Sequence, residues 1–195
     1  MKPTRTLQLI AVTIGLVSSV ALTNGQILYG TTGGASNPGN FYTINPATGF
    51  ATLVGPLRDS GLAPYAVTGL AFDAWGDLWV ASYMNGIARI PMKGSFSAAK
   101  SWSDLEYWSH RRGDHVPAWT DASDTVWTIA ADPDGSVWAG GPQGAFRFVG
   151  RTGQWISYRG VVPGPSVNQI FLDPRPGSRG VVFATDSGAF VYTGK

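Results

Sequence analysis

Residues 126–155, VWTIAADPDGSVWAGGPQGAFRFVGRTGQW, read as four short strands joined by three turns. The runs begin at Val126, Val137, Ala145 and Gln154, the first three of them apolar, and turn residues such as Gly, Pro and Asp separate them. Short apolar runs bounded by such residues predict strands, because Gly, Pro and Asp favour the backbone conformations of turns. The stretch therefore predicts an antiparallel meander of four strands.

The rest of the chain repeats this meander. Residues 64–91 match it at an offset of 59 residues, and residues 167–193 match it with Asp173 placed 41 residues after Asp132. A shorter copy at residues 27–55 begins with Tyr29 at the position of the tryptophan. The pairs that recur at the offset of 59 are Asp73/Asp132, Gly76/Gly135 and Trp79/Trp138.

Each recurring residue has a physical reason to be there. The Asp at the end of the first strand is expected to accept backbone N–H groups in the next turn, and the Gly after it to supply positive φ. The aromatic side chain is suited to fill the space between neighbouring sheets. We expect Trp79 and Trp138 to be buried between sheets, with Tyr29 and Phe183 in equivalent places.

A four-stranded repeat of roughly 40 residues predicts an all-β fold, a β-propeller of stacked antiparallel blades. The first copy lacks a first strand and the last copy lacks a fourth, so we expect a partial or open propeller of about four blades over residues 26–195. Open blade edges present unpaired strands and favour self-association. The expected blades are residues 27–55, 64–110, 122–160 and 164–195.

Two of these segments resemble known repeat families. VWTIAADPDGSVWAGGPQGAFRF, residues 126–148, resembles the repeat of two-component regulator propellers. VTGLAFDAWGDLWVASYMNGIARIP, residues 67–91, resembles the NHL-like group that includes gluconolactonase-like and streptogramin-lyase-like propellers. The resemblance implies the propeller architecture. It leaves function open, because enzymes, sensors and scaffolds share these structural residues.

Residues 1–25 have the features of a signal peptide. Lys2 and Arg5 precede an apolar stretch at residues 7–22, and small residues follow it. An uncleaved anchor helix is the alternative, although a membrane span needs about 20 residues. Cleavage predicts a secreted or periplasmic protein with no membrane segment. It also removes the formal net charge of +2, so the mature chain offers no basic surface for nucleic acid.

The chain departs most from its repeat between residues 92 and 124, where about 18 residues are inserted. Both histidines and the one glutamate, Glu106, lie there. We expect this fourth-to-first-strand connection to share one end of the propeller with the second-to-third-strand turns. An alternative is that residues 102–108 form an ordinary fourth strand and residues 110–115 a solvated turn. The candidate ligand-binding residues are Tyr83, Asn85, Trp108, His110, Arg111, Arg112, His115, Gln143 and Asp186.

No cofactor, metal or catalytic residue is predicted. His110, Asp114 and His115 lack metal-ligand spacing, residues 132–135 lack the later ligands of a calcium loop, and no Gly-x-Ser-x-Gly motif occurs. The sequence favours a non-catalytic exported propeller that senses or binds a small molecule, a carbohydrate, a peptide or a protein. The alternative is a lactonase-like or lyase-like enzyme with a metal or histidine in its central cavity. The inner-strand candidates for that role are Thr68, Thr128 and Asn168.

Overall fold

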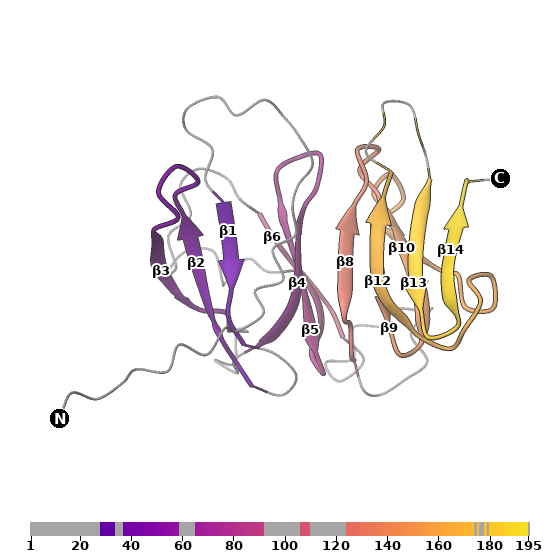
Figure 1. Ribbon diagram of the computed structural model, residues 1–195, viewed down its shortest axis with the longest axis horizontal. Helices are drawn as coiled ribbons and strands as arrows, with labels where there is room; N and C mark the ends of the chain where they lie inside the picture. Colours follow the sequence, from indigo (N-terminus) through magenta and orange to yellow (C-terminus); the bar gives the residue numbers. More distant parts are fainter. Residues whose placement is uncertain are drawn as a thin grey trace.

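The computed structural model describes residues 28–33, 37–58, 65–91, 106–109, 124–173, 175, 178 and 180–194. Within these residues the chain forms fourteen strands in four antiparallel sheets and no helix (Figure 1). The sheets have three, four, four and three strands in chain order, which confirms the predicted blades with an incomplete first and last member. None of the described segments is a helix that could span a membrane. The predicted signal peptide lies outside the described residues.

Each blade is a meander in which consecutive strands pair. The first blade contains β1 (Leu28–Thr31), β2 (Asn40–Ile44) and β3 (Ala51–Pro56). The second contains β4 (Ala66–Phe72), β5 (Leu78–Tyr83), β6 (Gly86–Ile90) and β7 (Glu106–Trp108). The third contains β8 (Thr128–Ala131), β9 (Val137–Gly141), β10 (Gly144–Val149) and β11 (Gln154–Ser157). The fourth contains β12 (Val167–Leu172), β13 (Val181–Thr185) and β14 (Gly188–Tyr192).

The turn between β4 and β5 is organised by the aspartate that the repeat singled out. Asp73 is buried, and its Oδ1 accepts hydrogen bonds from the backbone N–H groups of Trp75, at 2.9 Å, and Asp77, at 3.0 Å. Its Oδ2 accepts a third bond from Trp79 Nε1, at 2.8 Å. Because all three donors lie inside the turn or the next strand, this carboxylate fixes the geometry of the hairpin.

The equivalent turns of the next two blades use the same device. Asp132 accepts a bond from the backbone N–H of Asp134, and Asp173 accepts one from the backbone N–H of Arg175. The glycines that follow in the second and third blades both have φ near +83°, a conformation that disfavours any residue with a Cβ atom. The predicted roles of the repeated Asp and Gly are therefore confirmed.

Alternate residues along the second strand of each blade point toward opposite neighbours, as the pleat of a strand requires. In β5, Leu78 packs toward the first blade, while Trp79 packs toward the third blade. In β9, Val137 packs toward the second blade and Trp138 toward the fourth. Trp79 is 0% exposed and Trp138 is 1% exposed, so both tryptophans are buried between blades as predicted.

Phe183 is buried between blades as predicted, but it lies one residue away from the tryptophan position. Strand register pairs Ala130 with Trp138 in the third blade and Phe171 with Val182 in the fourth, so Val182 occupies the tryptophan position. Phe183 points the other way, back toward the third blade, and its ring centroid lies 5.4 Å from that of Trp138.

Tyr29 does occupy the tryptophan position of the first blade. It points toward the second blade, where its ring lies 5.2 Å from that of Phe72. The first blade therefore begins at a second strand, as its sequence predicts.

Candidate functional site

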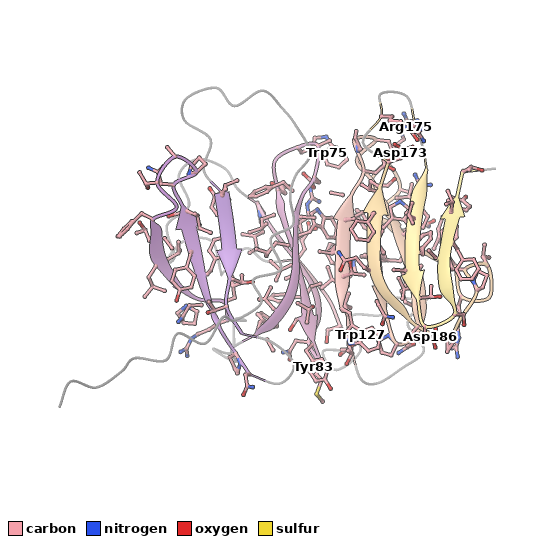
Figure 2. All side chains as sticks on the ribbon, in the orientation of Figure 1. Trp75, Tyr83, Trp127, Asp173, Arg175 and Asp186 are labelled. Carbon is pink, nitrogen blue, oxygen red and sulfur yellow. The ribbon has the colours of Figure 1, made fainter. Side chains whose placement is uncertain are left out.

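The two ends of the blades carry different kinds of residue. Trp75, Asp173 and Arg175 lie at the end that is uppermost in Figure 2, while Tyr83, Trp127 and Asp186 lie at the opposite end. We call these the upper end and the lower end. Since strands 1 and 3 of every blade run upward and strands 2 and 4 run downward, the β5–β6, β9–β10 and β13–β14 turns all lie at the lower end.

These three lower turns share their length and the position of one glycine, although only the turn of the second blade has a non-glycine residue with positive φ, Met84 at +68°. Each has two residues between the strands and a glycine with positive φ that begins the third strand, with φ of +76° at Gly86, +98° at Gly144 and +124° at Gly188. Their side chains nevertheless differ. The turn residues are Met84 and Asn85 in the second blade, Pro142 and Gln143 in the third, and Asp186 and Ser187 in the fourth.

The connection into the third blade joins the lower end, as predicted. The N–H of Gly86 donates to the carbonyl of Asp124 at 2.7 Å, and the N–H of Val126 donates to the carbonyl of Ser82 at 3.1 Å. Asp124 is buried, has φ of +49°, and accepts a bond from Ser109 Oγ at 2.7 Å. Backbone hydrogen bonds therefore attach the segment that precedes β8 to the β5–β6 hairpin, and the Ser109–Asp124 bond attaches it to the residue that follows β7.

Gly86 is required for this attachment. A Cβ atom at that position would collide with the carbonyl oxygen of Trp108, and the residue also needs φ of +76°.

The predicted site residues fall into three groups. Tyr83 and Asn85 are half-buried and Asp186 is exposed at the lower end, while Gln143 is buried there. Trp108 instead lies in β7 and stacks on Trp79, with ring centroids 5.0 Å apart. The interpretation of its segment as an ordinary fourth strand fits this position, and Trp108 packs between the second and third blades. The remaining candidates, His110, Arg111, Arg112 and His115, lie outside the described residues.

Trp127 is a lower-end residue that the sequence interpretation missed. It lies immediately before β8 and is half-buried. The repeat offsets contain the signal that identifies its position, since Thr68 lies 59 residues earlier and Asn168 lies 41 residues later. Trp127 and Tyr83 lie at the same end of the blades, and the Val126–Ser82 backbone bond joins the segments that carry them.

Two of the inner-strand ligand candidates of the enzyme alternative have structural partners. Thr68 Oγ1 donates to the carbonyl of Val126 at 2.5 Å, and Thr128 Oγ1 accepts a bond from the N–H of Ile170 at 3.2 Å. Each hydroxyl thus links its blade to the next one. Asn168 is exposed. The described residues contain no group of three or more His, Asp or Glu side chains that is suited to a metal ion.

The charged side chains at the upper end form ion pairs and hydrogen bonds with one another. Arg89 bridges Asp77 at 2.7 Å and Glu106 at 3.5 Å. The side chain of Arg175 hydrogen bonds to Asp173 and lowers the pKa of that carboxyl well below its usual range, helped by Ser178.

Asp134 is a further paired carboxylate of the upper end. Burial raises its pKa, but hydrogen bonds from Ser136 and the charge of Arg147 outweigh burial and lower the pKa overall. The upper-end carboxylates therefore have protein partners already.

A comparison with models of protein families finds no match, and a comparison with curated proteins finds none either. Solved structures do match. The extracellular domain assigned to the hybrid two-component system BT3049 of B. thetaiotaomicron is 14% identical over 90% of this chain, with a TM-score of 0.62. A gluconolactonase of Xanthomonas campestris is 14% identical over 87%, with a TM-score of 0.56. PorZ, a surface component of the Porphyromonas gingivalis type-IX secretion system, is 18% identical over 88%, with a TM-score of 0.55.

The chain is therefore a partial β-propeller. Its structural neighbours include both classes that the sequence resembles, the two-component sensor propellers and the gluconolactonase-like propellers. It spans 21% of the length of the first of these structures, 54% of the gluconolactonase and 25% of PorZ. At such low identity the likeness shows the fold.

Proposed function

We propose that this chain is an exported, non-catalytic propeller module that binds a ligand at its lower end. The observation that carries the proposal is the set of three lower turns, which share a two-residue length and a positive-φ glycine but present different side chains. Loops on a rigid scaffold are where binding residues usually lie. The upper-end carboxylates, in contrast, are occupied by bonds that fix the hairpins.

The chemistry of the lower end favours a carbohydrate. Tyr83 and Trp127 are two aromatic residues of the lower end that are half-buried, so part of each remains accessible. Asn85 and Asn168 add amide groups, which both donate and accept hydrogen bonds. Aromatic surface with a few polar groups is the usual composition of a small-molecule site, and it suits the apolar faces and hydroxyl groups of a sugar ring.

Export is supported by residues 1–25, which have the charge and apolar pattern of a signal peptide. It is also consistent with the neighbours, one of which is an extracellular domain and another a bacterial surface component.

The enzyme alternative has less support among the described residues. Thr68 and Thr128, which the alternative places at a catalytic centre, form hydrogen bonds between blades. We therefore prefer the binding function to the lactonase-like or lyase-like one.

A glycan array probed with the purified chain tests the proposal, followed by titration calorimetry with the best glycan. Trp127→Ala should weaken binding at least roughly tenfold, as expected when a central aromatic contact is removed. Phe50→Ala is the matched control, because Phe50 is an exposed aromatic residue of the β2–β3 turn at the upper end. It should bind like the unaltered chain.

The inserted segment is tested by the double change Arg111→Ala and Arg112→Ala. This variant should weaken the binding of acidic glycans, because it removes two positive charges, and it should leave the melting temperature nearly unchanged. The proposed function fails if no glycan binds, or if Phe50→Ala weakens binding as much as Trp127→Ala does.

A further inference from the structure

The outward face of the fourth blade is apolar and uncovered. Phe171, Val182 and Val191 lie directly opposite one another on β12, β13 and β14. Phe171 is 55% exposed and Val191 is 65% exposed. The next row on the same face contains Gln169, Ala184 and Ala189, so neither row carries a charge. We call this surface the fourth-blade face.

The outward face of the first blade is similar. Tyr42 lies opposite Leu53, and Ile44 lies opposite Leu28. Leu53 is 58% exposed and Leu28 is 43% exposed, while Tyr42 and Ile44 are half-buried. These four residues carry no charge either. We call this surface the first-blade face.

The first-blade face has the residue pattern of one side of the interface between the first and second blades. Strand register places Leu28, Tyr42 and Ile44 at the repeat positions of three residues of the second blade. Those residues pack toward the first blade and are almost completely buried. They are Leu78, Ala88 and Ile90.

The fourth-blade face has the residue pattern of the opposite side of a blade–blade interface, the side that the third blade contributes to its contact with the fourth. Phe171 and Val182 occupy the repeat positions of Ala130 and Trp138, which pack toward the fourth blade from the third. The two uncovered faces are thus the complementary halves of a blade–blade interface, placed at opposite ends of one arc.

A second copy of the chain supplies both missing halves. If the fourth-blade face of one copy packs on the first-blade face of another, the contact is heterologous, and two such contacts close a ring with twofold symmetry. The length is suitable for closure, because one chain spans 54% of a solved propeller of the same fold. Both copies would then present their lower ends on the same side of the ring.

We propose that the chain forms a two-copy ring in which the fourth-blade face of each copy packs on the first-blade face of the other. This contact differs from pairing of strand edges, because it buries sheet faces. It also stands independently of the ligand at the lower end.

Light scattering coupled to gel filtration tests the ring with the secreted chain. The unaltered chain should have twice the monomer mass. Leu53→Lys and Val191→Lys should each give a monomer, because each variant places a charge in both contacts. Val161→Lys is the matched control and should remain a dimer, since Val161 is 61% exposed but lies in the connection between β11 and β12, away from both faces.

Mixing the two monomeric variants distinguishes a head-to-tail contact from a symmetric one. In a mixed pair, one contact joins the unaltered fourth-blade face of Leu53→Lys to the unaltered first-blade face of Val191→Lys, while the other contact brings the two lysines together. The mixture should therefore regain dimers held by one contact, which dissociate at a higher concentration than the unaltered ring. Far-ultraviolet circular dichroism verifies that each variant is folded. A monomeric unaltered chain, a mass above the dimer, or dimers that persist in both folded lysine variants would overturn the proposal.

Discussion

Replacing each of the two equivalent tryptophans by phenylalanine separates packing from hydrogen bonding in the blade repeat. Trp79 and Trp138 are both fully buried and both contact several aromatic rings, so the two Trp→Phe changes remove similar packing. They differ in one bond. Trp79 Nε1 donates to Asp73 at 2.8 Å, whereas Trp138 Nε1 is buried with no hydrogen-bond partner among the described residues.

The size of the difference follows from that bond. A hydrogen bond to a charged group contributes about 1.5–3 kcal/mol, and an unpaired buried donor costs about 1–3 kcal/mol. Trp79→Phe loses the bond and leaves Asp73 with one donor fewer, while Trp138→Phe removes an unpaired donor. We therefore expect Trp79→Phe to lower the free energy of unfolding by at least about 1.5 kcal/mol more than Trp138→Phe does.

Urea unfolding followed by far-ultraviolet circular dichroism measures this difference. The comparison is valid if both variants keep the m-value of the unaltered chain. Equal losses in the two variants would refute the idea that the Asp73–Trp79 bond stabilises the hairpin, and so would a larger loss for Trp138→Phe.

Three further predictions concern the upper end and the leader. Hydrogen bonding by Arg175 lowers the pKa of Asp173 in the folded chain. The ionised Asp173 side chain therefore gives its full stabilisation above the unfolded-state pKa of about 3.9, and this stabilisation disappears as the pH falls below that value. In urea titrations, the free energy of unfolding that Asp173→Asn loses relative to the unaltered chain should thus be constant from neutral pH down to about pH 5 and shrink below about pH 4. A loss that is unchanged at low pH would contradict this. Gly150→Ala should destabilise the chain by about 1–3 kcal/mol, because its Cβ would lie 2.6 Å from the carbonyl oxygen of Gly135 and 2.7 Å from Trp75 Cη2; unchanged urea unfolding would show that the space is available. Mass spectrometry of exported protein should find an N-terminus between Leu22 and Ile27, and an intact Met1 would exclude cleavage.

The architecture was predictable because its decisive residues are local. Asp73 and Asp132 accept bonds within their own hairpins, and the glycines after them supply positive φ, so both features can be inferred from a few neighbouring letters. Phe183 was misplaced for the opposite reason. Val181, Val182 and Phe183 are all apolar, so alternation along the strand does not distinguish its two faces. The longer turn after Asp173 also removed the fixed spacing from aspartate to tryptophan.

The candidate site was only partly predictable. Tyr83, Asn85, Gln143 and Asp186 could be assigned to one end of the blades from the sequence, because strand direction alone places their turns there. Trp127 does not stand out in the sequence because it lies within the apolar run that begins at Val126, although the repeat offsets align it with Thr68 and Asn168. The packing role of Trp108 depends on long-range contacts with Trp79 and Phe148, which no local pattern specifies.

Binding at the lower end is tested most directly by NMR on chain labelled with ¹⁵N-tryptophan. The indole resonances of Trp127 and Trp75 report on the lower and upper ends, and Trp→Phe variants assign them. Addition of the glycan selected by the array should shift the Trp127 indole signal progressively and leave the Trp75 signal unchanged. A shift of Trp75 with Trp127 unmoved would place binding at the wrong end and contradict the proposed site.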